Sequence, residues 1–133
     1  KKEFTSHISP GSHGSTYGGG PVACRVVEFM IQEVGKDKIL NNVREQGAYL
    51  KSELETLADE TGALANVRGL GLMLAADYKQ GNVKDLILAC LGNGLVVLAC
   101  GDNSLRVLPP LIITKDHVDE AIAKLKKTLM EMK

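Results

Sequence analysis

A glycine-rich segment near the start of the chain, residues 13–21, has the residue types that bind a phosphate group. It contains four glycines, His13, the adjacent hydroxyl residues Ser15 and Thr16, an aromatic residue and a closing Pro21. Glycines let the backbone approach a ligand closely because they have no Cβ atom and adopt positive φ angles. Backbone N–H groups and hydroxyls near a helix start are donors that phosphates prefer. The segment therefore predicts a phosphate-binding loop, although a flexible turn before a helix has the same composition.

A charged residue, Arg106, stands in an otherwise apolar strand pattern shortly before Pro109 and Pro110. An unpaired charge inside a protein is costly, and the planar guanidinium suits a carboxylate bound through two hydrogen bonds. The pattern therefore predicts that Arg106 pairs with a carboxylate. The alternative is an ordinary strand arginine that reaches solvent.

The other reactive side chains predict neither a metal site nor a hydrolase triad. Arg68 is expected to form a structural ion pair, and the spacing identifies no partner for Asp77. The cysteines Cys24, Cys90 and Cys100 are widely spaced and form no metal-binding motif. Cys24 and Cys90 lie in apolar helical patterns and are predicted to be small core residues.

The composition predicts one globular domain. The chain has 133 residues, 44% of them hydrophobic, and its 16 Lys and Arg balance its 16 Asp and Glu. Without a basic excess, neither nucleic acid nor an anionic membrane is an expected partner. No signal peptide is apparent, and the apolar runs are far shorter than the ~20 residues of a membrane span. Cysteines without predicted disulfides favour a reducing, cytoplasmic location.

The periodicity of apolar residues predicts helices alternating with short strands. Helices are expected over residues 21–35 and 38–60, over a short segment that Asn82 caps and that reaches about Leu91, and after Thr114. The strands are expected over residues 67–78, 95–99 and 104–108. The last two strands are predicted to form a hairpin, with residues 95–99 central in the sheet because that stretch is apolar.

This order of elements predicts an α+β fold, a small and mainly antiparallel sheet with helices packed on one face. Residues 1–20 show no clear periodicity and are predicted to form an irregular arm that contains the phosphate loop. Residues 21–133 are predicted to form the packed domain.

Segments in the same order along nearly the whole chain resemble motifs of one family, the class III pyridoxal-phosphate (PLP) aminotransferases. The resemblance is closest to their acetylornithine branch. Residues 13–21 resemble H-G-[ST]-T-[FY]-G-G-N-P, residues 67–73 resemble V-R-G-x-G-L-M, and residues 105–113 resemble L-R-x-x-P-P-L-x-I. Gly20 stands where the family has Asn, so hydrogen bonds made by that Asn side chain are absent here.

The resemblance assigns roles to residues of this chain. It implies the C-terminal small domain of a fold-type I PLP enzyme, whose PLP phosphate would be bound by Thr16 from the neighbouring subunit of a homodimer. Ser15 is the adjacent candidate for the same contact, and a turn hydroxyl bonded to its own backbone is the alternative for Thr16. Arg106 would face the active site and pair with a glutamate of the large domain or with a substrate carboxylate.

The resemblance also implies that the chain is the C-terminal part of a longer enzyme and holds no catalytic residue itself. The lysine that binds the cofactor covalently lies upstream in the family, and Lys1 and Lys2 match the segment that follows it, so the chain alone is expected to be inactive. The complete enzyme would transfer an amino group from N-acetylornithine or a similar amine to 2-oxoglutarate, giving glutamate in cytoplasmic arginine biosynthesis. Other class III members, acting on ornithine, 4-aminobutyrate or a diamine, remain alternatives. So does a stand-alone, non-catalytic α+β binding domain.

Overall fold

A computed structural model of the chain describes residues 5, 8–9 and 11–132. Lys1 and Lys2 lie outside these described residues. The chain divides into two compact units, residues 1–36 and residues 37–133. The first unit contains the glycine-rich segment and helix α2 (Pro21–Val34). The division between an arm of residues 1–20 and a domain of residues 21–133 stays a prediction.

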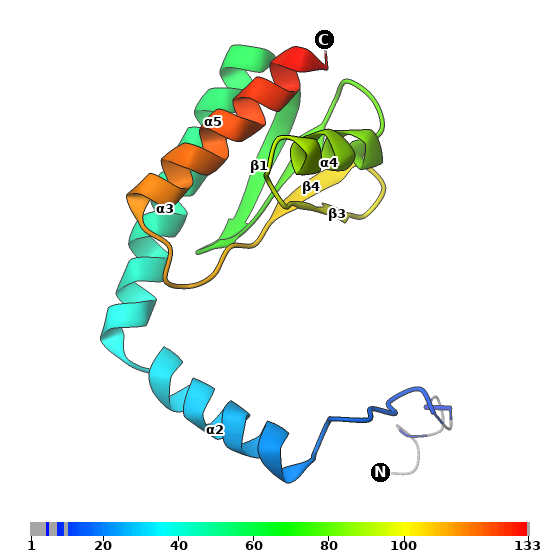
Figure 1. Cartoon of the computed structure of the whole chain (residues 1–133), viewed down its shortest axis with the longest axis vertical. Coiled ribbons are helices and arrows are strands. Elements are labelled where there is room, and N and C mark those ends of the chain that lie inside the picture. The colour runs from blue at the N-terminus through cyan, green and yellow to red at the C-terminus, as the bar shows by residue number, and fades with distance from the viewer. Residues whose placement is uncertain (1–4, 6–7, 10, 133) are drawn as a thin grey trace. The chain divides into compact units, whose positions relative to one another are not determined.

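The second unit is a four-stranded antiparallel sheet covered by helices. Its helices are α3 (Asp37–Thr61), α4 (Val83–Gly92) and α5 (Lys115–Glu131), and its strands are β1 (Leu64–Leu70), β2 (Met73–Tyr78), β3 (Leu98–Cys100) and β4 (Ser104–Val107). The strand order is β1-β2-β4-β3. In Figure 1, α3 and α5 run side by side along the sheet. The predicted fold class, α+β with an antiparallel sheet, is confirmed.

One core holds the helices to one face of the sheet. Apolar residues of all three helices and of β1, β2 and β4 join a single buried cluster. Leu54 of α3, Leu86 of α4 and Leu129 of α5 are at most 1% exposed within it. Because β2 alternates, its residues Leu74 and Ala76 point into this core. The intervening residues of β2 must therefore face the opposite side of the sheet.

The single strand predicted over residues 67–78 is wrong, because the structure has the β1–β2 hairpin there. Gly69 has a φ of +137° and Gly71 a φ of +55°. A Cβ atom on Gly69 would lie 2.0 Å from the carbonyl oxygen of Met73. The alternation of leucines continues through the turn and hides it from a search for period-two patterns. The two glycines were the signal that the chain reverses here.

The prediction that residues 95–99 form a central strand is also wrong. The strand is β3, and it lies at the edge of the sheet beyond β4. Val97 is buried, but Val96 and Leu98 are 78% and 49% exposed. Residues 95–99 are apolar because some of their side chains lie on an exposed part of this unit, not because the strand is buried on both faces. The β3–β4 hairpin is confirmed.

The predicted helix ends are confirmed at several positions. The Asn82 side chain accepts a hydrogen bond of 2.9 Å from the backbone N–H of Lys84 at the start of α4. Gly35 caps the C-terminus of α2, and Thr114 is the N-cap residue of α5. These short-range signals succeed because a cap depends only on residues within one helical turn.

The prediction for buried cysteines is half correct. Cys90 is fully buried in α4, and burial raises the pKa of its thiol. Cys24 is exposed, as is Cys100. The physical reason is that α2 has no buried residue, so its apolar pattern does not correspond to a packed face in this unit. Within the described part of the chain, no helix is both long and apolar enough to span a bilayer.

Candidate functional site

The glycine-rich loop is a series of short turns that leads into α2. The Ser15 hydroxyl accepts a hydrogen bond of 2.9 Å from the backbone N–H of Gly18. A Cβ atom on Gly18 would lie 2.9 Å from that same hydroxyl oxygen, so the turn favours glycine at this position. Gly19 follows with a φ of +80°, which other residues rarely adopt. Glycine therefore fits the conformation of this loop.

The two hydroxyls of the loop are exposed, and both have a proton to donate. A hydroxyl has one donor and two acceptor sites, so Ser15 still has its O–H free while it accepts from Gly18. Thr16 makes no side-chain hydrogen bond with any residue that the structure describes. The turn-hydroxyl role considered for Thr16 thus belongs to Ser15. Two hydroxyl donors next to a glycine backbone are chemically suited to a phosphate group.

The second group of candidate residues lies on the sheet face opposite the helices, here called the open face. Arg68, Ala75 and Arg106 are paired across β1, β2 and β4, so they share one row of that face. Asp77 and Ser104 are opposite one another in the next row toward the end of β2. Side chains paired in this way project from the same face, about 5 Å from strand to strand. The open face therefore brings together polar residues from three strands.

Arg106 is half-buried on the open face, and its Nε atom is buried without a hydrogen-bond partner. None of the ion pairs among the described residues includes Arg106. A buried, charged donor left unsatisfied costs free energy that a partner would recover. Arg106 thus has no ion-pair partner among the described residues, and its pairing with a carboxylate stays a prediction.

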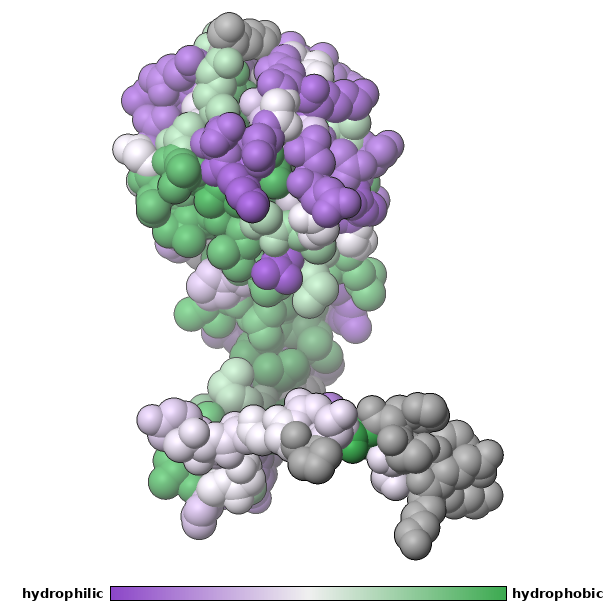
Figure 2. All heavy atoms as spheres, turned by 90° about the vertical axis from the view of Figure 1, so that its right-hand side faces the viewer, coloured by the Kyte–Doolittle hydropathy of each residue, from purple (hydrophilic) through white to green (hydrophobic). Residues whose placement is uncertain are grey.

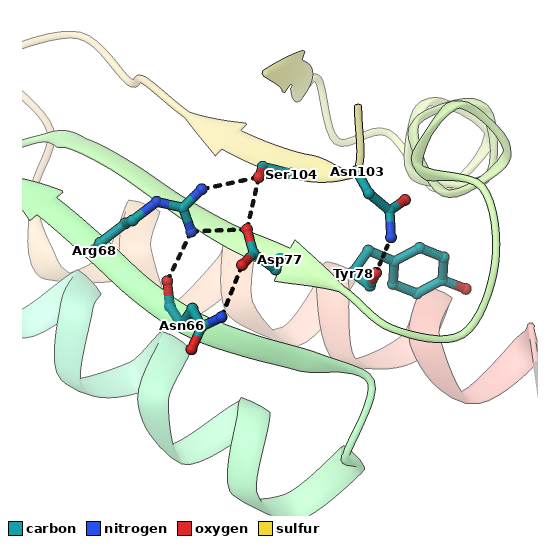
Figure 3. A network of polar contacts seen from close by, with 6 residues as sticks. All are labelled: Asn66, Arg68, Asp77, Tyr78, Asn103 and Ser104. Atoms are coloured by element: carbon teal, nitrogen blue, oxygen red, sulfur yellow. Dashed lines mark hydrogen bonds and ion pairs between the residues drawn. The ribbon is translucent and has the colours of Figure 1, made fainter. Parts of the chain in front are cut away.

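Arg68 forms the predicted structural ion pair, and its partner is Asp77 (Figure 3). One guanidinium nitrogen donates to Asp77 Oδ1 at 2.7 Å, and the other donates to the Ser104 hydroxyl at 2.9 Å. Ser104 in turn donates to Asp77 Oδ1 at 2.6 Å. Asp77 thus has partners that the spacing does not reveal, because one continuous strand over residues 67–78 would hold Arg68 and Asp77 far apart.

A β-bulge completes this network. The register of β1 shifts between Ala65 and Arg68, and Asn66 in the bulge has a φ of +49°. Asparagine tolerates this left-handed conformation better than most residues. The Asn66 side chain donates to Asp77 Oδ2 at 2.9 Å. Hydrogen bonds from Ser104, Asn66 and Arg68 together lower the pKa of Asp77 from 3.8 to about 2.

Because folding lowers the pKa of Asp77, part of the stability of the fold depends on pH. The variant Asp77→Asn should lack this part. Because the pKa of Asp77 is lower in the folded state, its ionised form stabilises the fold fully above about pH 4, and this contribution is lost as the pH falls toward 2. We expect urea unfolding to show a large difference between wild type and Asp77→Asn at pH 5 and a much smaller one at pH 2.5. Asp102→Asn, an exposed turn variant outside the network, is the control. A difference that is the same at both pH values would contradict the assignment.

Known proteins resemble this chain along almost its whole length. The profile described as "Aminotransferase class-III" matches residues 1–129. The acetylornithine aminotransferase of Aquifex aeolicus (strain VF5) is 41% identical over 97% of the chain, and the match covers 32% of that relative. The chain therefore spans about a third of the length of this relative.

Solved structures agree with this assignment. The acetylornithine aminotransferase from Elizabethkingia anophelis is 34% identical with a TM-score of 0.77, over 93% of this chain and 33% of that one. The ornithine aminotransferase from Toxoplasma gondii, in which PLP partly occupies the active site, is 25% identical with a TM-score of 0.75, over 94% of this chain and 30% of that one. The profile match alone covers far more than half of the residues. Together with the motifs around Thr16, Arg68 and Arg106, it shows that the chain belongs to the class III aminotransferase family.

Proposed function

We propose that this chain is the C-terminal part of an acetylornithine-type aminotransferase that uses PLP and transfers an amino group to 2-oxoglutarate. The observation that carries the proposal is the family match over residues 1–129, with an acetylornithine aminotransferase 41% identical to the chain. That relative is about three times as long as this chain, so the lysine that binds PLP would lie in a larger domain. No catalytic residue is assigned to the chain itself.

The glycine-rich loop would bind the phosphate of PLP in the partner subunit of a homodimer. PLP, when bound, supplies the electron sink of the reaction. The contribution of this chain would be two hydroxyl donors, Thr16 and Ser15, held by a backbone that glycines shape. The free hydroxyl of Thr16 supports this role, because a donor without an internal partner can bond a ligand without breaking another hydrogen bond.

Arg106 would bind a carboxylate, either from the 2-oxo acid or amino acid substrate or from a glutamate of the large domain. The lack of a side-chain hydrogen bond or ion pair for Arg106 among the described residues supports this role, since a carboxylate can bond the two terminal nitrogens of its guanidinium together. The planar guanidinium would fix the orientation of that carboxylate as well as its position. Arg106 would therefore contribute to substrate selection rather than to proton transfer.

The exposed apolar side chains support a large domain as the partner of both units. In α2, Val22 and Ile31 are 79% and 69% exposed, and in the second unit Leu70 and Ile112 are 89% and 75% exposed. Figure 2 shows hydrophobic side chains gathered on part of the surface of the sheet-containing unit, with hydrophilic side chains over much of the rest. Large contiguous apolar surfaces on soluble proteins commonly mark contacts. The large domain would cover them.

Thr16→Val in the full-length protein tests the phosphate role. The variant has nearly the same shape but no donor, and we expect the dissociation constant of PLP to rise about tenfold, as for the loss of ~1–2 kcal/mol from one hydrogen bond to a charged group. Spectroscopic titration of the apoprotein with PLP measures this constant. Thr16→Ser, which keeps the hydroxyl, should bind PLP as the wild type does.

Ser12→Ala is a control just before the segment, because the Ser12 hydroxyl donates to the backbone oxygen of Ser9 at 2.7 Å. It should leave PLP binding unchanged. Equal affinity for PLP in wild type and Thr16→Val would argue against the phosphate role.

A further inference from the structure

The open face of the sheet carries two guanidinium groups in one row, and they differ in their partners. Arg68 and Arg106 are both paired with Ala75, one from each neighbouring strand. With strands about 4.8 Å apart, their Cα atoms are about 10 Å from each other. Alanine is too short to separate them. Two cations at this spacing would attract a ligand with more than one negative charge if both were free.

Of these two arginines, only Arg106 has no ion pair with a described residue. The guanidinium of Arg68 leans toward the next row, where it bonds Asp77 and Ser104 (Figure 3). Asp77 is held in place by two further donors, the Ser104 hydroxyl at 2.6 Å and the Asn66 side chain at 2.9 Å. The carboxylate therefore stays beside Arg68 and cancels its charge.

We propose that Asp77 is a specificity-determining residue that neutralises Arg68, so that the open face presents a single cation, Arg106, to an anionic substrate. The inference rests on the carboxylate role proposed for Arg106. The charge selectivity of this site is then set by a residue that does not itself contact the substrate. The group that fits this position is a single carboxylate, so a dicarboxylate such as 2-oxoglutarate would bind Arg106 through one end only, with its other end held away from Arg68.

The effect of Asp77 on the charge of the open face can be separated from its structural role by comparing variants of Asp77 and Arg68. Removing either residue breaks the same ion pair. Asp77→Asn leaves an unpaired cation near Arg106, whereas Arg68→Met leaves an unpaired anion. Any loss of stability acts in the same direction in both variants. The effect on the binding of a doubly charged ligand must act in opposite directions.

Glutarate and pentanoate are suitable probes, because they have the same chain length and differ by one terminal carboxylate. Their inhibition constants are measured on the full-length protein at low salt, since ionic screening weakens such effects. The ratio of the glutarate constant to the pentanoate constant should fall about fivefold in Asp77→Asn and rise about fivefold in Arg68→Met. The double variant, which removes both charges, should return the ratio to within about twofold of wild type.

Arg106→Gln distinguishes this inference from the proposal on which it rests. If Arg106→Gln weakens both inhibitors but the single variants leave the ratio unchanged or shift it in the same direction, the role of Asp77 in specificity is overturned and the role of Arg106 stands. If Arg106→Gln changes neither inhibition constant, both proposals fail. Opposite shifts in the single variants, together with weaker inhibition in Arg106→Gln, are the expected result.

Discussion

Arg106→Lys in the full-length protein is expected to raise KM for 2-oxoglutarate about 100-fold while leaving the affinity for PLP unchanged. Lysine keeps the positive charge but replaces the planar fork with a single ammonium group, which cannot bind both oxygens of a carboxylate in one plane. Each charged hydrogen bond lost costs ~1.5–3 kcal/mol. The two terminal nitrogens of Arg106, which bond no other described residue, are the pair of donors that lysine cannot provide.

Steady-state kinetics with varied 2-oxoglutarate measure the effect, and PLP titration checks that the cofactor still binds. Arg44→Lys is the matched control, because Arg44 is an exposed residue of α3 whose guanidinium bonds the Asn41 side chain at 2.9 Å. It should leave both constants unchanged. A KM in Arg106→Lys within twofold of the wild-type value would show that Arg106 is an ordinary strand arginine.

The local part of the fold could be predicted from the sequence because it depends on neighbouring residues. The 3.6-residue spacing of Leu50, Leu54 and Leu57 identifies α3, and all three lie in the core. The cap at Asn82 and the β3–β4 hairpin follow from side chains a few positions apart. These signals act over one turn of helix or one tight turn of chain.

The sheet order and the polar network could not be predicted, because they depend on where the chain reverses. Treating residues 67–78 as one strand concealed the hairpin, and with it the ion pair between Arg68 and Asp77. The bulge at Asn66 shifts the register by one residue, which changes the face on which each following side chain lies. No alternation pattern reveals such a shift in advance.

The candidate site also has a part that can be predicted from neighbouring residues and a part that cannot. Thr16 and Ser15 could be proposed from composition and from a short motif, since the residues of such a loop are continuous in sequence. Arg106 could be found because a charge in an apolar strand is conspicuous. Its neighbours on the open face come from three strands, so their proximity is a property of the sheet rather than of any segment.

Gly47→Ala is expected to lower the stability of the chain by at least ~3 kcal/mol, an overpacking effect at the contact between α3 and the β1–β2 turn. A Cβ atom on Gly47 would lie 2.4 Å from the backbone oxygen of Gly71. Backbone cannot rotate away as a flexible side chain can, so either the helix or the turn must move. In the unit of residues 37–133 this corresponds to a fall in Tm of more than ~12 °C, measured by circular dichroism of the chain.

Gly92→Ala is the matched control, because it makes the same change in a helix where nothing lies within 4 Å of the new Cβ atom. It should raise the Tm slightly, since alanine loses less conformational entropy than glycine in a helix, a gain of ~0.5 kcal/mol. If both variants unfold within a few degrees of wild type, α3 does not pack against Gly71 as described. If only Gly47→Ala unfolds early, the close contact between α3 and this turn is established. That contact holds the hairpin in place, and with it the two strands on which Arg68 and Asp77 meet.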